Sequence, residues 1–463
     1  HEHVTKEKPA MSIAPTREHV LPDYMKASDL LKVAPMSMKA DGDKVMLDGI
    51  DLRDIARDFG TALYVYDEAH IRRQLASYRD EFRTCYPQSG IVYAAKAFCC
   101  VAMDKIVAEE DCYIDVASGG ELAIARAAGF PMDRIFAQGN NKSQREIEEY
   151  VDAGVACFVV DTHEEIERIS SYASSKGLTQ KIIIRVCPGI EADTHAYIQT
   201  ANEDSKFGFN IRNGAAEEAL VYALTLPGVE VAGFHCHIGS QIFELTSYVE
   251  AINTMFGFMN DMRQAHGFVA QIFDMGGGLG IPYTIYDRPS TIAQFAQIAT
   301  GAVHANCSEY DYPYPRIFVE PGRSIVANAG ITLYTVGSVK TVPGICTYVA
   351  IDGGMTDNIR TALYGSKYEA FVVERADKPR DVICDIVGKH CESGDVVVKN
   401  APLQACEAGD HICVLGTGAY CNEMASNYNK QVRPGIVFVR DGVAREVVRR
   451  ETYDDLLARD ISA

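Results

Sequence analysis

Eight short runs of apolar and β-branched residues alternate with amphipathic helical stretches between about residues 90 and 325. This alternation is typical of repeated strand–helix units around a parallel sheet, and eight parallel strands close into a barrel. The sequence therefore predicts an α/β fold that is built on a TIM-type (β/α)8 barrel. The predicted strands are Ile91–Ala97, Cys112–Ser118, Arg134–Gln138, Cys157–Asp161, Lys181–Cys187, Val231–Ile238, Gln271–Gly276 and Arg316–Glu320.

After Arg323 the pattern changes to strands separated by turn residues, which predicts an antiparallel β domain over residues 326–463. Residues 36–60 contain VMLDGIDL, a hairpin-like run with Asp-Gly at its turn, and are expected to join that domain. The barrel is then expected to span residues 61–325, and residues 1–35 to form a mobile tail. The strands predicted in the β domain are Thr347–Asp352, Asp395–Lys399, His411–Leu415 and Gly435–Val439.

The composition excludes several classes of partner. The 463 residues carry a net charge of −19, so nucleic acids and anionic membrane surfaces would be repelled. No run approaches about 18 apolar residues, and the first 20 residues lack the apolar core of a signal peptide. The 14 cysteines form no CxxC pair and no zinc-ligand spacing. We therefore expect a cytoplasmic, metal-free enzyme that acts on a small molecule.

Polar residues follow the predicted strands at the carboxyl-terminal face of the barrel, where barrel enzymes place their chemistry. A polar residue in such a position can instead cap the next helix, and this alternative stays open for Ser118 and Asp161. In strand order these residues are Lys96, Asp115 with Ser118, Asn140, Asp161, Arg185, His237 with Ser240, Gly276–Gly278 and Glu320.

Lys96 lies in IVYAAKAF, where the period-2 alternation of a strand directs Ala94 and Lys96 to one face. We expect this lysine to be desolvated, because burial disfavours the ammonium form and frees the amine to form a Schiff base. The alternative is a strand-end lysine that reaches into water.

Two later runs suit the binding of a phosphorylated aromatic ring. DMGGGLG (274–280) has three consecutive glycines, which let backbone N–H groups approach a phosphate, although it lacks the GxGxxG spacing of dinucleotide sites. In VEPGRSI, Glu320 suits a protonated pyridine nitrogen, unless it forms a salt bridge with Arg323. In GFHCHIGSQ, His235 and His237 share one strand face, so an imidazole could stack on the ring.

The order of motifs along nearly the whole chain resembles the diaminopimelate decarboxylase family of fold-type III pyridoxal-phosphate enzymes. The matching runs are YAAKAF, HIGSQ, GGGLG, EPGR, DGGMTDNIRTALYG, HCESGD and GAYCNEMASNYN. This resemblance implies a barrel with a β domain and pyridoxal 5′-phosphate as cofactor. It makes Lys96 the Schiff-base lysine, His237 the stacking residue and Glu320 the partner of the pyridine nitrogen. The cofactor-binding set it implies is Lys96, Asp115, His237, Ser240, Gly276, Gly277, Gly278, Glu320, Gly322, Arg323 and Tyr420.

The resemblance also implies the substrate side of the site. Cys391 resembles the proton donor of the reaction, and Glu392 resembles the acid that recognises the distal ammonium of the substrate. In this family the CESGD loop crosses a dimer interface, so we expect a homodimer with shared active sites. The substrate-binding set it implies is Arg323, Arg360, Tyr364, Glu392 and Tyr420.

The implied reaction is decarboxylation of meso-2,6-diaminopimelate to L-lysine and carbon dioxide. Ornithine, arginine and carboxynorspermidine decarboxylases remain alternatives, although ornithine enzymes typically carry Asp where this chain has Glu392. A non-catalytic regulatory homologue is a further alternative, disfavoured because Lys96, Cys391 and Tyr420 are all retained. A nicotinamide-dependent oxidoreductase is disfavoured because the glycine run lacks the fingerprint spacing.

Overall fold

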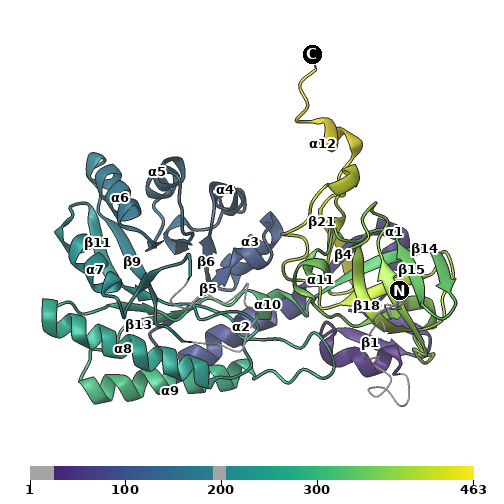
Figure 1. Ribbon diagram of the computed structural model, residues 1–463, viewed down its shortest axis with the longest axis horizontal. Coiled ribbons are helices and arrows are strands. Elements are labelled where there is room, and N and C mark those ends of the chain that lie inside the picture. Colours follow the sequence, from purple (N-terminus) through teal and green to yellow (C-terminus); the bar gives the residue numbers. More distant parts are fainter. Residues whose placement is uncertain (1–24, 191–204, 463) are drawn as a thin grey trace, which may run out of the picture.

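The computed structural model describes residues 25–190 and 205–462, and its larger unit is a closed parallel barrel with helices on the outside (Figure 1). All eight predicted barrel strands form, and the pairing of the fourth with the fifth closes the ring. The strands are nearly continuous apolar runs because both of their faces are buried. They are β5 (Ser89–Ala94), β6 (Tyr113–Val116), β7 (Ile135–Ala137), β8 (Cys157–Val160), β9 (Gln180–Cys187), β11 (Val229–His235), β12 (Ile272–Asp274) and β13 (Arg316–Val319), with the short β10 (Phe209–Asn210) beside β9.

Polar caps start several of the surrounding helices. The Ser118 hydroxyl accepts from the backbone N–H of Glu121 at 3.1 Å, so the capping interpretation of Ser118 is correct. Asp161 does not cap a helix, since its Oδ2 accepts from the backbone N–H of Gly208 and Thr162 provides the cap. The barrel helices are α2 (Glu68–Cys85), α3 (Val101–Glu109), α4 (Gly119–Ala127), α5 (Gln144–Ala153), α6 (His163–Ser175), α7 (Ala215–Thr225), α8 (Thr246–His266), α9 (Ile292–Tyr310) and α10 (Arg323–Val326).

The second unit is a nine-stranded β domain beside the barrel (Figure 1). Its sheet is mixed rather than purely antiparallel, because β15 pairs with β17, and β20 with β4, in parallel. Its short helices are α11 (Arg360–Tyr364) and α12 (Tyr453–Leu457). Its strands after the barrel are β14 (Gly330–Val342), β15 (Cys346–Ile351), β16 (Ala370–Val372), β17 (Val382–Val387), β18 (Val396–Leu403), β19 (His411–Leu415), β20 (Gly435–Arg440) and β21 (Val443–Val448).

The domain boundaries differ from prediction near the N-terminus. Strand β4 (Leu63–Asp67), expected in the barrel, pairs with β14 and β20 inside the β-domain sheet, and all five of its residues are buried. Residues 25–35 are not a free tail, because a 3₁₀ helix at Ala27–Val33 buries Leu30 and Val33 against the β domain. Residues 1–24 of the predicted tail lie outside the described residues.

The predicted N-terminal segment forms its own small sheet, which packs on the β domain. Strands β1 (Met38–Asp41), β2 (Lys44–Leu47) and β3 (Ile50–Asp51) make this sheet, and helix α1 (Leu52–Phe59) follows. Val45 and Leu47 share one buried apolar cluster with residues of the large sheet.

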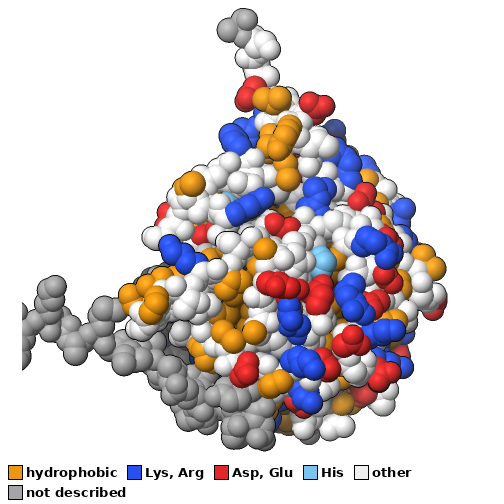
Figure 2. All heavy atoms as spheres, turned by 90° about the vertical axis from the view of Figure 1, so that its right-hand side faces the viewer, with side chains coloured by type: hydrophobic (Ala, Val, Ile, Leu, Met, Phe, Trp, Pro, Cys, Tyr) orange, Lys and Arg blue, Asp and Glu red, His pale blue; other side chains and the backbone are white. Residues whose placement is uncertain are grey.

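Among the described residues no helix is both long and apolar enough to cross a bilayer. On the β-domain face shown in Figure 2, side chains of both charges are interspersed. This mixture generates no extended field of one sign on that face.

A buried ion pair fixes the loop between β7 and α5, which reaches the carboxyl-terminal face of the barrel. Lys142 Nζ lies 2.5 Å from Glu165 Oε1, and the two side chains are 1% and 3% exposed. The same amine donates to the carbonyls of Gly139 and Val159 at 2.8 and 2.7 Å. Both charges are therefore compensated, and the loop is tied to the end of β8.

We expect Lys142→Met to lower the free energy of unfolding by about 3–5 kcal/mol, because it leaves Glu165 buried without its partner. Arg145→Gln on α5, the helix that follows this loop, is the control, since its pair with Glu149 is at the surface. The control should change stability by less than about 0.5 kcal/mol in the same denaturant titration. Equal effects of the two substitutions would contradict the role of the buried pair.

Candidate active site

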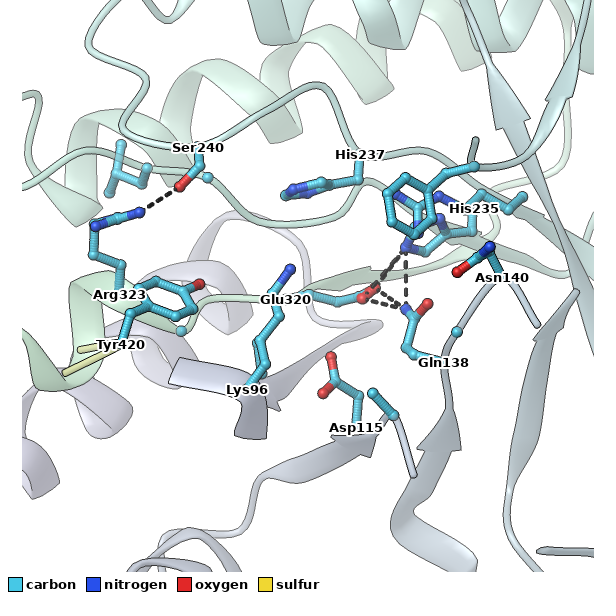
Figure 3. A pocket seen from close by; sticks show the side chains of 18 of the residues that line it. Lys96, Asp115, Gln138, Asn140, His235, His237, Ser240, Glu320, Arg323 and Tyr420 are labelled. Carbon is cyan, nitrogen blue, oxygen red and sulfur yellow. Dashed lines mark hydrogen bonds and ion pairs between the residues drawn. The ribbon is translucent and has the colours of Figure 1, made fainter. Parts of the chain in front are cut away.

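A cavity of about 320 Å³ opens at the carboxyl ends of the barrel strands. Figure 3 shows its polar side chains converging from several strand ends and from the β domain. The lining residues outside the cofactor set implied by the resemblance include Gln138, Asn140, Arg185 and His235. The lining residues that belong to that set are Lys96, Asp115, His237, Ser240, Gly278, Glu320, Gly322, Arg323 and Tyr420.

Lys96 projects into this cavity, although its local structure differs from the prediction. Strand β5 ends at Ala94, and Lys96 sits in a single 3₁₀ turn, Ala95–Ala97. Its side chain is exposed to the cavity, so the expectation of a desolvated lysine on an apolar strand face is wrong. Asp115 holds this turn, because its Oδ1 accepts from the backbone N–H of Ala95 at 3.2 Å. The amine is therefore accessible, and its backbone is fixed.

Glu320 carries the densest set of hydrogen bonds in the cavity. Its Oε1 lies 2.6 Å from Nε2 of His235, and the Gln138 amide donates to both carboxylate oxygens at 2.8 Å (Figure 3). Burial acts to raise the pKa of Glu320, but His235, a hydrogen bond with Asp274 and the charge of Arg185 together outweigh burial and hold that pKa below the usual range. The predicted alternative, a salt bridge from Glu320 to Arg323, does not form, since Arg323 donates to Ser240 and Tyr283 instead.

His237 is held as a neutral ring. Burial and the nearby Lys96 charge lower the pKa of His237 well below its usual range. The backbone N–H of Gly277 donates to its Nδ1 at 3.2 Å, so that nitrogen is the acceptor and the proton sits on Nε2. A flat, uncharged imidazole at this position is suited to stacking on an aromatic ring.

The glycine run lies where only glycine fits. Gly276 and Gly278 have φ angles of 72° and 106°. A Cβ on Gly277 would lie 2.0 Å from the carbonyl oxygen of Glu320. The bend after β12 therefore approaches the end of β13 closely, and it runs beside Ser240 and Arg323, whose side chains are 2.8 Å apart. Close backbone, a hydroxyl and a guanidinium together form a cradle that fits a phosphate group.

One wall of the site comes from the β domain. Tyr420 lies beneath two guanidinium groups, with its ring centroid 4.8 Å from Arg323 Cζ and 5.6 Å from Arg360 Cζ. Arg360 is 8% exposed and also lies 5.3 Å from the ring of Tyr364. Neither Arg360 nor Tyr364 lines the cavity. Arg360 contacts Tyr420, which does, and Tyr364 contacts Arg360.

The predicted loop residues Cys391 and Glu392 do not line this cavity. Both side chains are exposed, and the backbone N–H of Cys391 donates to Asn429 Oδ1 at 2.7 Å. The preceding residue, His390, is buried and bonded to Asp395 Oδ2 at 2.7 Å, which anchors the loop. Within one chain these two residues are thus separate from Lys96 and Glu320.

Sequence reasoning assigned no role to Gln138 or Tyr283. It named Arg185 only as a polar residue at a strand end and His235 only as one of two histidines on a strand face. Gln138 ends a predicted strand, so its strand-end position could have indicated it. Arg185 is 8% exposed and stacks on Phe207 at 4.5 Å, and among the described residues it has no carboxylate partner. Tyr283 lies in a loop after the glycine run, where no periodic pattern points inward.

We expect Gly277→Ala to destabilise the protein by about 1–3 kcal/mol, because the added Cβ overlaps the Glu320 carbonyl. Gly301→Ala is the matched control. Gly301 lies inside α9 with nothing within 4 Å of an added Cβ, so alanine there should stabilise by up to about 1 kcal/mol. Thermal unfolding of the two variants should therefore shift in opposite directions, and shifts of the same sign would contradict the close approach.

Comparison with known proteins connects this geometry to a family. Residues 68–327 match the model of the pyridoxal-dependent decarboxylase, pyridoxal binding domain. The diaminopimelate decarboxylase of Bacillus subtilis (strain 168) is 44% identical over 413 residues, which cover 89% of this chain and 94% of that protein.

Two solved structures of the M. jannaschii diaminopimelate decarboxylase are also similar. The first has a TM-score of 0.87 at 32% identity and covers 92% of this chain and 98% of its own. The second, a co-complex with L-lysine, has a TM-score of 0.86 at 31% identity and covers 95% and 99%. The barrel, the β domain and the residues around Lys96 thus occur together in a chain that belongs to the diaminopimelate decarboxylase family.

Proposed function

We propose that this chain catalyses the pyridoxal-phosphate-dependent decarboxylation of meso-2,6-diaminopimelate to L-lysine and carbon dioxide. The observation that carries the proposal is the convergence of Lys96, His237 and Glu320 on one cavity that also meets the Arg323–Tyr420–Arg360 wall. The names of the relatives and the lysine bound to one of them support the same reaction.

The residues present fit the cofactor. Lys96 would hold its aldehyde carbon, and Glu320 would face its ring nitrogen. The glycine run, Ser240 and Arg323 would hold its phosphate, because the close backbone approach at Gly277 leaves room for N–H groups and for no side chain. When bound, the cofactor supplies an electron sink for the pair left on the α-carbon as carbon dioxide departs.

The protein's own contribution is orientation, charge and proton delivery. Neutral His237 offers a flat face on one side of the cavity without adding a charge. Arg323 and Arg360 can bind a carboxylate that is not lost in the reaction, which fixes which end of the substrate reacts. The amine of Lys96 is exposed to the cavity and can accept or return a proton there.

The proposed proton donor and the proposed distal acid come from a second subunit. Cys391 and Glu392 are exposed on an anchored loop away from the cavity of their own chain. In a homodimer with two-fold symmetry, the same loop of each subunit can complete the other's site. A thiol at that position would protonate the former α-carbon, and the Glu392 carboxylate would bind the distal ammonium of the substrate.

Borohydride reduction of the purified holoenzyme should fix the pyridoxyl group on Lys96, as mapped by peptide mass spectrometry. Lys96→Ala should lose the visible absorbance of the bound cofactor, whereas the exposed Lys105→Ala should keep it.

Meso-diaminopimelate should be decarboxylated faster than ornithine or arginine in competition assays. A faster reaction with either of those amino acids would contradict the substrate, and a colourless protein that takes up no cofactor would favour the binding-protein alternative.

Mixing inactive Lys96→Ala and Cys391→Ala proteins should restore activity if the sites are shared. Random exchange makes half of the dimers mixed, and each mixed dimer has one intact site, so about one quarter of wild-type activity is expected. Mixing Lys96→Ala with Glu320→Ala is the control, because both changes lie in one chain's cavity; each mixed dimer then has no intact site. No recovery after verified subunit exchange would contradict the shared site.

A further inference from the structure

His235 lies behind Glu320 and is hydrogen-bonded to its carboxylate. Its side chain is 1% exposed, and Nε2 reaches Oε1 of Glu320 at 2.6 Å. Gln138 Nε2 bonds both carboxylate oxygens and lies 3.3 Å from Nε2 of His235. These three side chains come from β11, the loop after β7 and the end of β13, so the barrel itself sets their spacing (Figure 3).

The other nitrogen of His235 identifies its tautomer. Nδ1 is buried and has no hydrogen-bond partner among the described residues. A protonated Nδ1 would therefore be a buried donor without an acceptor, which costs free energy. The proton that faces Glu320 is therefore on Nε2, which donates it to the carboxylate. The imidazole thus binds Glu320 by a directed hydrogen bond.

The charged groups around Glu320 decide which of the three neighbouring carboxyl groups is ionised. Asp274 at the end of β12 and Asp115 at β6 are both buried, and burial together with the charge of Glu320 raises the pKa of each well above its usual range. Arg185 from β9 and Lys96 provide positive charge, and His237 is neutral. Because neighbouring carboxyl groups do not all ionise, the negative charge rests on Glu320, the one with two side-chain N–H donors.

We propose that His235 is a positioning residue: together with Gln138 it fixes the Glu320 carboxylate as an anion in one orientation, and so keeps the ring nitrogen of the cofactor protonated. This inference rests on the proposed function, because it needs the cofactor in the cavity. The reason is physical. A carboxylate free to rotate or to take up a proton would no longer stabilise a positive ring nitrogen, and the ring would become a weaker electron sink.

The test is the ¹⁵N chemical shift of ring-labelled pyridoxal phosphate in the holoenzyme, followed across pH. In wild type the nitrogen should stay protonated. Leucine in His235→Leu has no hydrogen-bond donor. In this variant the ring nitrogen should lose its proton at a pH that is lower than in wild type by about one unit or more, a tenfold change in proton affinity. His235→Gln, whose amide can reach as far as Nε2, should restore the wild-type titration. His163→Leu on α6 is the control, since its ring contacts Phe209 and Tyr222 rather than the cavity.

Cofactor content and attachment to Lys96 are measured first in every variant. Wild type without cofactor on Lys96 would refute the proposed function, whereas a loaded His235→Leu protein with the wild-type nitrogen titration would refute the role of His235. If His235→Leu does not load, His235→Asn takes its place, because its shorter amide lies nearer the backbone than Nε2. A merely structural histidine would lower stability in these variants and leave the nitrogen titration unchanged.

Discussion

Closure of the barrel by the pairing of β8 with β9 is the constraint on which the site depends. Lys96 follows β5, His235 ends β11 and Glu320 follows β13. These strands are far apart in the chain, and the three residues face one cavity only because the sheet closes on itself. A closed parallel sheet also puts every strand end at the same mouth. The close fit at Gly277 is a consequence, since the bend after β12 must pass the carbonyl of Glu320.

Closure of the barrel brings together three carboxyl groups, which do not all ionise so close to one another. Asp115, Asp274 and Glu320 are all at least nine-tenths buried, and burial acts to raise the pKa of each. Two side-chain N–H donors distinguish Glu320 from its neighbours and favour the negative charge on this carboxylate. The barrel thereby places one defined negative charge opposite a lysine, which is the arrangement that a pyridinium ring requires.

Much of this organisation could be predicted from local patterns, and the rest depends on contacts between distant residues. The eight barrel strands follow from apolar runs that end in polar residues, and their order alone puts Lys96 near Glu320. The placement of β4 in the second sheet could not be predicted from the sequence. A strand of five buried residues suits either unit, and only its pairing with β14 and β20 assigns it to the β domain. The predicted burial of Lys96 was also wrong. Strand β5 ends at Ala94, although the alternation of apolar residues in the sequence continues past that point. The tautomer of His235 depends on what lies beside Nδ1, which sequence spacing does not contain.

The division of labour between the two units explains how the proposed catalytic loop with Cys391 and Glu392 can lie away from the cavity of its own chain. The barrel supplies the groups around the ring and phosphate, and these need spacing fixed by hydrogen-bonded strands. The β domain supplies Tyr420 and Arg360, which set how far the wall is from Lys96. A loop that only has to deliver a proton and recognise a distal ammonium can be contributed by a second chain, provided that it is rigid. The buried His390–Asp395 pair gives the Cys391 loop that rigidity before any partner is bound. In the proposed dimer, a subunit alone would hold the cofactor and lack the proposed proton donor, so loss of dimerisation should abolish turnover while leaving the cofactor on Lys96.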